Sequence, residues 1–267
     1  MTGDDDTPAR QPLAPVSGLS GLRRFTPARI ALGRPGAALP TKDALTFMHD
    51  HARARDAVHV PLDFDALAAD LAALGLASVR VASAARDRTE YLRRPDLGRK
   101  LAPESRSRLE VLAAERLATP ADIIVVAADG LSSLAVAENG PPLIARLMPL
   151  FREAGRSLGP IVLVAEGRVA IGDEIGEVLK ARIVIMLVGE RPGLSAADSL
   201  GAYVTYAPHV GRSDAERNCI SNIRAAGLPV ADAATDICAL VDAALNHELT
   251  GVALNSALTA AKLIGGS

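Results

Sequence analysis

The stretch "RIVIMLVG", Arg182 to Gly189, decides the fold, because its apolar run continues almost without interruption after the first residue. A strand with one face in water alternates apolar and polar residues, whereas this run has apolar side chains on both faces. Two further runs share the pattern: "IIVVAA" (Ile123 to Ala128) and "PIVLVAE" (Pro160 to Glu166). Strands buried on both faces are typical of a parallel sheet covered by helices on both sides.

Helical patterns separate these runs. The segment "PPLIARLMPLFREAGRSLG" lies between the first and second runs, and "IGDEIGEVLKA" lies between the second and third. Strands that alternate with helices predict an α/β fold, here a Rossmann-like, doubly wound and mainly parallel sheet. We assign this fold to residues 105–267.

The chain before residue 105 has a different pattern. Thr41 is a predicted N-cap for a helix with one apolar face, and "PLDFDALAADLAALG" repeats apolar residues at helical spacing. The face of the first helix consists of Ala44, Leu45, Phe47 and Met48. We therefore predict a smaller, mainly helical N-terminal unit over residues 26–104, with "APESRSRLEVLAAERLA" as the helix that links it to the α/β domain. Residues 1–25, rich in Asp, Pro and Gly near their start, are predicted to be a flexible tail.

Composition excludes several classes of protein. A net charge of −2 over 267 residues removes the electrostatic case for binding nucleic acid. The two cysteines, Cys219 and Cys238, are too few for a disulfide framework or a cysteine-based metal site, which suits a reducing cytosol. No apolar stretch reaches the roughly 18 residues that a membrane span needs. His49 and His51 are two residues apart and so do not share a helical face, which argues against a metal site there.

In open α/β sheets, ligands bind beyond the carboxyl ends of the strands. Two of the predicted strand ends carry polar residues that could either contact a ligand or serve only to shape the local structure. Asp129, Gly130 and Ser132 follow the first run, where helix capping and ligand contact are both consistent with the residue types. After the second run, "EGRVAIGDEIG" has Arg168 and Val169 at the tip of a tight loop, and spacing alone favours a simple turn.

The third strand end carries "GERPG". Glu190 and Arg191 either pair with each other or bind a ligand, and their place at the crevice, before the polar Ser195, Asp198 and Ser199, favours a ligand. Neither G-x-G-x-x-G nor G-x-x-x-x-G-K-[ST] is present at the strand ends, so a dinucleotide or nucleoside triphosphate site has no support. No nucleophile and base can be paired from the sequence. The residues therefore favour a binding domain over a complete active site.

Seven stretches in order carry a resemblance to a known family. They are "ARIALGRPGAALPT", "FMHDHARARDAVH", "YLRRPDLGRKL", "VVAADGLSS", "GRVAIGDEIGEVL", "LVGERPGLSAADSLGAYVTYAP" and "DAERNCISNIRAAGL". With them, the chain resembles the small (light) subunits of adenosylcobalamin-dependent ethanolamine ammonia-lyases. The resemblance implies a heteromeric lyase that converts ethanolamine to acetaldehyde and ammonia by radical chemistry, in ethanolamine catabolism.

In this family a large (heavy) subunit carries the substrate site, and the small subunit helps to enclose the cobalamin. The resemblance therefore implies a hetero-oligomer in which this chain alone is inactive and supplies no catalytic residue and no metal ligand. Matched by motif, the cofactor contacts fall on Val169 in "GRVAI", Glu190 in "VGERPG" and Cys219 in "RNCISN". Arg191, Gly193 and Ser221 are their loop neighbours. The chain has no D-x-H-x-x-G motif, so the resemblance implies base-on cobalamin.

Two alternatives and one departure remain. The chain could be a purely structural clamp for the large subunit without cofactor contacts, or a stand-alone α/β enzyme acting on a small metabolite. Some family members carry an amphipathic N-terminal helix that targets them to a bacterial microcompartment. The start of this chain, "MTGDDDTPARQPLAPVSG", has too many Asp, Pro and Gly residues for that helix. We expect a cytoplasmic protein and leave its encapsulation open.

Overall fold

The structure is a computed structural model that describes residues 20–26, 28–30, 32, 38–116 and 120–265. The chain divides into two compact units, residues 1–53 and 54–267. Most of the predicted tail lies outside the described residues. The first unit contains a 3-10 helix, η1 (Ser20–Phe25), and most of α1 (Thr41–His59). The structure confirms a helix that begins at Thr41, but the side chains of Leu45, Phe47 and Met48 on its apolar face are exposed.

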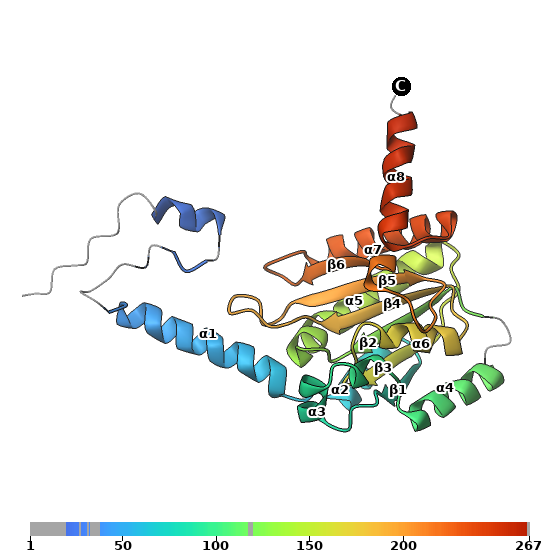
Figure 1. Cartoon of the computed structure of the whole chain (residues 1–267), viewed down its shortest axis with the longest axis horizontal. Helices are drawn as coiled ribbons and strands as arrows, with labels where there is room; N and C mark the ends of the chain where they lie inside the picture. The colour runs from blue at the N-terminus through green and yellow to red at the C-terminus, as the bar shows by residue number, and fades with distance from the viewer. Residues whose placement is uncertain (1–19, 27, 31, 33–37, 117–119, 266–267) are drawn as a thin grey trace, which may run out of the picture. The chain divides into compact units, whose positions relative to one another are not determined.

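The second unit is built on a six-stranded sheet in the order β1-β3-β2-β4-β5-β6 (Figure 1). The strands are β1 (Ser78–Ala82), β2 (Ile123–Ala128), β3 (Ile161–Ala165), β4 (Ile183–Gly189), β5 (Leu200–Tyr206) and β6 (Asn218–Ile223). Strands β1, β3, β2 and β4 are parallel, and β5 is antiparallel to both β4 and β6. The predicted α/β class with a mainly parallel sheet is confirmed, and the three apolar runs form β2, β3 and β4.

The other three strands do not come from continuous apolar runs. Strand β1 lies within residues 26–104 and pairs with β3, so the sheet takes a strand from the range predicted to form the N-terminal unit. Strands β5 and β6 come from the stretch that follows Glu190, whose polar start gave no strand signal. Strand β5 is mostly buried because β4 and β6 flank it. The division at residue 104 stays a prediction.

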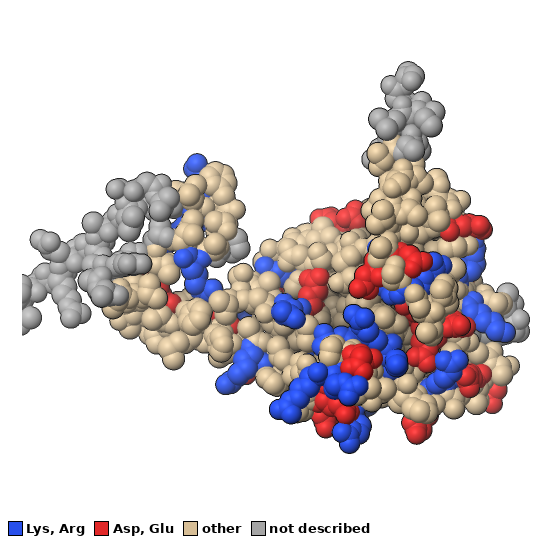
Figure 2. All heavy atoms as spheres, viewed as in Figure 1, with Lys and Arg blue, Asp and Glu red and all other residues tan. Residues whose placement is uncertain are grey.

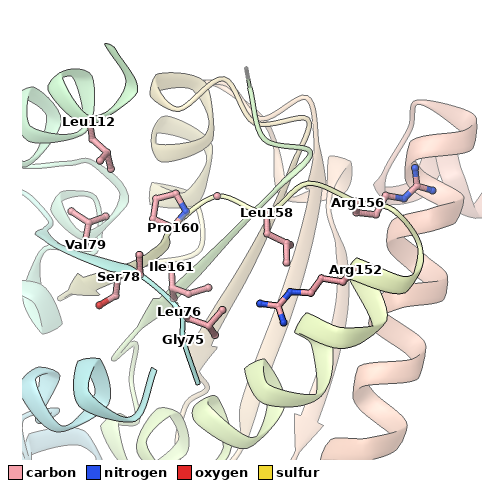
Figure 3. Close-up of a pocket in the computed structure, with 12 residues that line it drawn as sticks. Gly75, Leu76, Ser78, Val79, Leu112, Arg152, Arg156, Leu158, Pro160 and Ile161 are labelled. Carbon is pink, nitrogen blue, oxygen red and sulfur yellow. The ribbon is translucent and has the colours of Figure 1, made fainter. Parts of the chain in front are cut away.

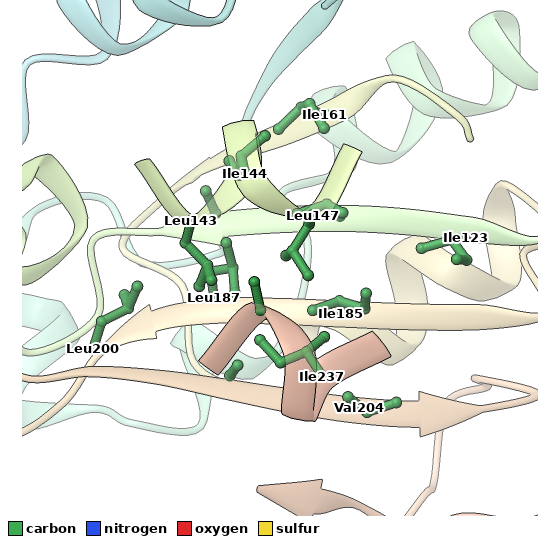
Figure 4. Packing of buried hydrophobic residues seen from close by; sticks show 14 of the residues in the cluster. Ile123, Leu143, Ile144, Leu147, Ile161, Ile185, Leu187, Leu200, Val204 and Ile237 are labelled. Carbon is green, nitrogen blue, oxygen red and sulfur yellow. The ribbon is translucent and has the colours of Figure 1, made fainter. Parts of the chain in front are cut away.

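The helices of this unit are α2 (Phe64–Ala73), α3 (Arg88–Arg93), α4 (Pro103–Arg116), α5 (Ser133–Glu153), α6 (Ile171–Val178), α7 (Val230–His247) and α8 (Gly251–Gly265), with 3-10 helices η2 (Leu97–Arg99) and η3 (Asp214–Glu216). Helices α5 and α7 cover one face of the sheet, and α4 and α6 cover the other. Alternate residues of each strand face opposite sides. Ile123 and Ile185 pack with α5 and α7 in one cluster (Figure 4), whereas Ile124 packs with α4 and α6 in the other.

The connections after β2 and β3 leave the sheet in opposite directions. The chain leaving β2 enters α5, and the chain leaving β3 enters α6, which packs on the other face. Adjacent parallel strands with diverging connections mark the edge at which ligands bind in open α/β sheets. The end of β4 lies at the same edge and continues into the loop that begins with Glu190.

No single helix among the described residues is long and apolar enough to cross a membrane. Only α7 and the start of α8 taken together, with a bend of 86° between them, reach that length and composition.

Candidate cofactor site at the carboxyl edge of the sheet

Two of the three predicted contact residues line one cavity. Val169, in the loop after β3, and Cys219, in β6, both border a cavity of about 370 Å³ at the carboxyl edge of the sheet. The remaining lining residues are Pro95, Arg99, Arg168, Ala170, Tyr203, Asp214 and Arg217. The fold thus brings together side chains that are far apart in the sequence.

The third residue, Glu190, does not line this cavity, but its carboxylate lies close to the lining residues Tyr203 and Cys219, whose pKa is raised by burial and, to a smaller extent, by that negative charge. Its Oε2 accepts hydrogen bonds from the hydroxyl of Ser199 at 2.6 Å and from the backbone N–H of Asn222 at 3.2 Å. These contacts connect the end of β4 to β6. The carboxylate is therefore anchored by Ser199 and Asn222, and no ion pair joins it to Arg191, although the structure describes both residues. Of the two interpretations from the sequence, the pairing of Glu190 with Arg191 is wrong.

Tyr203 and Cys219 are neutral polar groups at this site. They are cross-strand partners in β5 and β6. Burial, and secondarily the negative charge of Glu190, raises the pKa of the Cys219 thiol, and burial also raises the pKa of the Tyr203 phenol. A thiol with a raised pKa is a poor nucleophile at neutral pH, so this pair favours hydrogen bonding and packing over catalysis.

A buried ion pair holds the two walls of the cavity together. Arg217, next to β6, donates from Nη1 to Oδ1 of Asp173 in the first turn of α6, and both side chains are almost completely buried. The Nη2 of Arg217 also donates to the backbone carbonyl of Arg212 at 2.8 Å. Val169 lies just before α6 and Cys219 just after Arg217, so this pair fixes their relative position.

The first strand end has structural roles. Ser132 accepts a hydrogen bond from the backbone N–H of Ala135 at 3.1 Å and caps α5, and its hydroxyl donates to the carbonyl of Ala197 at 2.6 Å. Buried Asp129 accepts backbone N–H bonds from Glu166 at 3.1 Å and Gly167 at 3.3 Å. Burial and the nearby Glu166 carboxylate raise the pKa of Asp129 to about 7.

The loops after β2 and β4 touch through glycines. A Cβ atom on Gly189 would lie 1.9 Å from the carbonyl oxygen of Ser132. Gly130 has a φ of +59°, and a Cβ atom there would lie 2.4 Å from the carbonyl oxygen of Gly189. The backbone N–H of Leu131 donates to that same carbonyl at 2.8 Å. Position 189, just before Glu190, therefore requires glycine, because the backbone of the loop after β2 lies where a side chain would be.

Sequence reasoning did not single out four residues of this site: Arg99, Tyr203, Asp214 and Arg217. Arg99 lies in "YLRRPDLGRKL", which stood out only as one of the stretches that carry the family resemblance. Tyr203 lies in β5, which had no strand signal. The clustering of arginines in the segments before β2 and β6 was the available signal, but only the folded chain brings those segments together.

A second cavity lies at the opposite edge of the sheet. It has a volume of about 530 Å³ and borders the amino ends of β1 and β3, at Ser78 and Ile161 (Figure 3). Of its two arginines, Arg156 forms an ion pair with Asp242 at 2.7 Å, and Arg152 extends toward Leu76. None of the predicted contact residues lines it. The smaller cavity is therefore the candidate site.

Comparisons with known proteins agree with the resemblance seen in the sequence. A family model described as "Ethanolamine ammonia-lyase light chain (EutC)" matches residues 17–255. The chain is 52% identical to a protein of Ralstonia nicotianae over 256 residues, which cover 95% of this chain and 92% of the relative. It is also 52% identical to a protein of Bradyrhizobium diazoefficiens over 260 residues, which cover 96% of this chain and 98% of the relative. Both relatives are named ethanolamine ammonia-lyase small subunit.

Proposed function

Because this chain belongs to the ethanolamine ammonia-lyase light-chain family, we propose that it acts as the small subunit of such a lyase. In this proposal it joins a large (heavy) subunit and helps to bind adenosylcobalamin at the interface between them. The complex deaminates ethanolamine to acetaldehyde and ammonia. This chain alone is inactive, since it contributes one wall of the cofactor site.

The observation that carries the proposal is the convergence of the three motif-matched residues. Val169 and Cys219 line one cavity, and the carboxylate of Glu190 is held beside it at the end of β4. These residues come from three separate motifs, at positions where open α/β sheets bind ligands.

The chemistry of these residues fits a corrinoid. Adenosylcobalamin has a large apolar macrocycle edge, many amide side arms and one phosphate, so it requires dispersed hydrogen-bonding groups. Val169 offers an apolar surface, Glu190 offers an acceptor for amide N–H groups, and the neutral Cys219 can pack or donate weakly. Arg168 also lines the cavity, and its guanidinium offers N–H donors to the cofactor.

The size of the cavity supports a shared site. A cavity of about 370 Å³ cannot enclose a corrin macrocycle with its nucleotide tail, so this chain covers one side of the cofactor and the large subunit must cover the rest. When bound, the cofactor supplies the radical chemistry through its cobalt–carbon bond. This chain positions the cofactor and excludes water from one side of it. We further propose that the cofactor stays base-on, since the chain lacks the D-x-H-x-x-G motif that replaces the lower base.

The test uses the assembled complex with cyanocobalamin as the probe. We expect Glu190→Ala to weaken cyanocobalamin binding by roughly tenfold, the loss of about 1.5 kcal/mol that a hydrogen bond to a charged group contributes. Glu153→Ala, at the exposed end of α5, is the matched control and should leave the affinity unchanged. An unchanged affinity for Glu190→Ala in a folded, assembled complex favours the structural clamp.

A second assay addresses the stand-alone enzyme. Ethanolamine deamination is measured with adenosylcobalamin for this chain, for the large subunit, and for the two together. Activity only in the mixture supports the proposal, and activity of this chain alone contradicts it.

A further inference from the structure

Tyr91 organises an arginine cluster beside the candidate site. Its ring is buried, and its hydroxyl donates to the carbonyl of Gly167 at 3.1 Å. The guanidinium of Arg168 lies over the ring at 4.3 Å from the centroid, and that of Arg88 lies at 4.9 Å. A Cβ atom on Gly98 would lie 2.8 Å from the side chain of Arg168, so the absence of a side chain at Gly98 lets Arg168 approach the ring.

Arg168 is held in place but not satisfied. Its backbone N–H donates to the carbonyl of Gly98 at 2.7 Å, and its Nη2 makes a long contact of 3.5 Å with the carbonyl of Tyr91. Its Nε is buried and has no hydrogen-bond partner among the described residues. A buried donor without a partner costs about 1–3 kcal/mol, so a water, an ion or a ligand group that reaches Arg168 would offset that cost.

The wall that Arg168 shares with Arg99 has an excess of positive charge. Among the residues that the structure describes, three arginines and one acid, Asp214, line the cavity, and Arg217 is already neutralised by Asp173. Neither Arg99 nor Arg168 forms an ion pair with any described residue. On the face shown in Figure 2, basic side chains gather around α3 and the segments near it, with acidic ones between them.

We propose that Arg99 and Arg168 form a phosphate subsite that binds the phosphodiester of the nucleotide tail of the cobalamin. The inference rests on the proposed function and adds a ligand group and two binding residues to it. Guanidinium groups bind phosphate oxygens with charge-assisted hydrogen bonds. Stacking on Tyr91 holds the guanidinium of Arg168 in place before the ligand arrives, so little side-chain entropy is lost on binding.

The phosphate is the group of the cofactor that matches this wall. The amide side arms of the corrin are neutral and can use the carboxylate of Glu190 and backbone groups. Two guanidinium groups without an ion-pair partner among the described residues favour an anion beside Val169, and the phosphodiester is the anionic group of the cofactor. A free phosphate ion has the same chemistry, so the experiment must separate the two sources.

The experiment uses the complex of this chain with its large subunit and two matched probes, cobinamide and cobinamide phosphate. These corrinoids both lack the nucleotide base and differ by the phosphate alone. Their dissociation constants are measured by displacement of cyanocobalamin, for the wild type, Arg99→Gln and Arg168→Gln. Arg152→Gln, an arginine at the opposite edge of the sheet, is the control for a general loss of positive charge. Inorganic phosphate alone is titrated against the corrinoid-free complex.

We expect wild-type complex to bind cobinamide phosphate about tenfold more tightly than cobinamide, the effect of about 1.4 kcal/mol. Arg168→Gln and Arg99→Gln should remove most of this preference while leaving the affinity for cobinamide unchanged, and Arg152→Gln should retain it. A wild type that does not distinguish the two corrinoids, including one that binds neither, overturns the subsite. So does a loss of affinity for both probes in the arginine variants.

Two results separate this inference from the proposed function. If inorganic phosphate binds through Arg99 and Arg168 but the two cobinamides bind equally, the site takes free phosphate and the subsite for the cofactor is wrong. If cyanocobalamin binds to the wild-type complex and depends on Glu190, the proposed function stands even when the phosphate subsite fails.

Discussion

Arg217 and Asp173 form an ion pair in which the two side chains are only 3% and 4% exposed, with 2.5 Å between Nη1 and Oδ1. The pair joins the segment that enters β6 to the first turn of α6. Burial raises the pKa of Asp173, although the hydrogen bond and charge of Arg217 lower it. The pair therefore forms only when the segment entering β6 lies against the first turn of α6. This contact keeps Val169 and Cys219 beside the same cavity.

Breaking this pair should destabilise the chain strongly. We expect Arg217→Met to lower the free energy of unfolding by about 3–5 kcal/mol, because the Asp173 carboxylate is left buried and unpaired. Urea unfolding of the full chain measures this. The control is Arg156→Met, which breaks an ion pair with Asp242 in which the side chains are 25% and 44% exposed, and which should cost about 1 kcal/mol or less. Equal costs for the two variants would contradict the role assigned to burial.

Asp129 should make stability depend on pH. Its pKa in the folded chain, raised by burial to about 7, exceeds its ordinary value, so protonation favours the folded state. This contribution is fully present below about pH 4 and is lost as the pH rises through about 7. Between pH 5 and pH 8, the stability of the wild type relative to Asp129→Asn should fall by on the order of 2–3 kcal/mol. A difference between the two proteins that stays constant from pH 5 to pH 8 is the contrary result.

The two glycines around Glu190 should respond differently to alanine. At Gly189 a Cβ atom would meet the backbone of the β2 loop at 1.9 Å, so we expect Gly189→Ala to cost about 3 kcal/mol or more. At Gly193 the nearest atom is the Cβ of Ala196 at 3.9 Å, and Gly193→Ala should change stability by about 0.5 kcal/mol or less. Thermal and urea unfolding of both variants check the contrast. A tolerated Gly189→Ala would show that the two loops separate easily.

Under the proposed function, Cys219 should report on cofactor binding. In the assembled complex, cyanocobalamin should slow alkylation of Cys219 several-fold and leave Cys238 in α7 unaffected. The reaction is run at alkaline pH, because burial raises the pKa of the Cys219 thiol, and burial also raises the pKa of Cys238, to about 11. Mass spectrometry of the labelled peptides measures both rates. Labelling of Cys219 at the same rate with and without the corrinoid would separate this residue from the cofactor site.

Much of the fold is encoded in local patterns. The runs that form β2, β3 and β4 are buried on both faces. In a chain with intervening helices, such a run is typical of an inner strand of a parallel sheet. Strands β5 and β6 gave no such signal. Strand β5 is flanked by β4 and β6, so its buried state follows from its neighbours rather than from its own residues.

The candidate site divides in the same way. Motifs identified Val169, Glu190 and Cys219, and the strand end identified the position of Glu190. The anchoring of Glu190 by Ser199 and Asn222, and the capping role of Ser132, follow only from the tertiary structure, because each of these side chains had several possible partners in the sequence.

By itself the sequence determined the α/β class, the family and the three residues matched by motif, because hydrophobic patterns and motifs are properties of short segments. Only the tertiary structure decided that Arg217 faces Asp173 and that Arg168 stacks on Tyr91 beside Arg99. Contacts of this kind join segments far apart in the chain. Whether a charge is neutralised or left free depends on those contacts, and no local pattern records them.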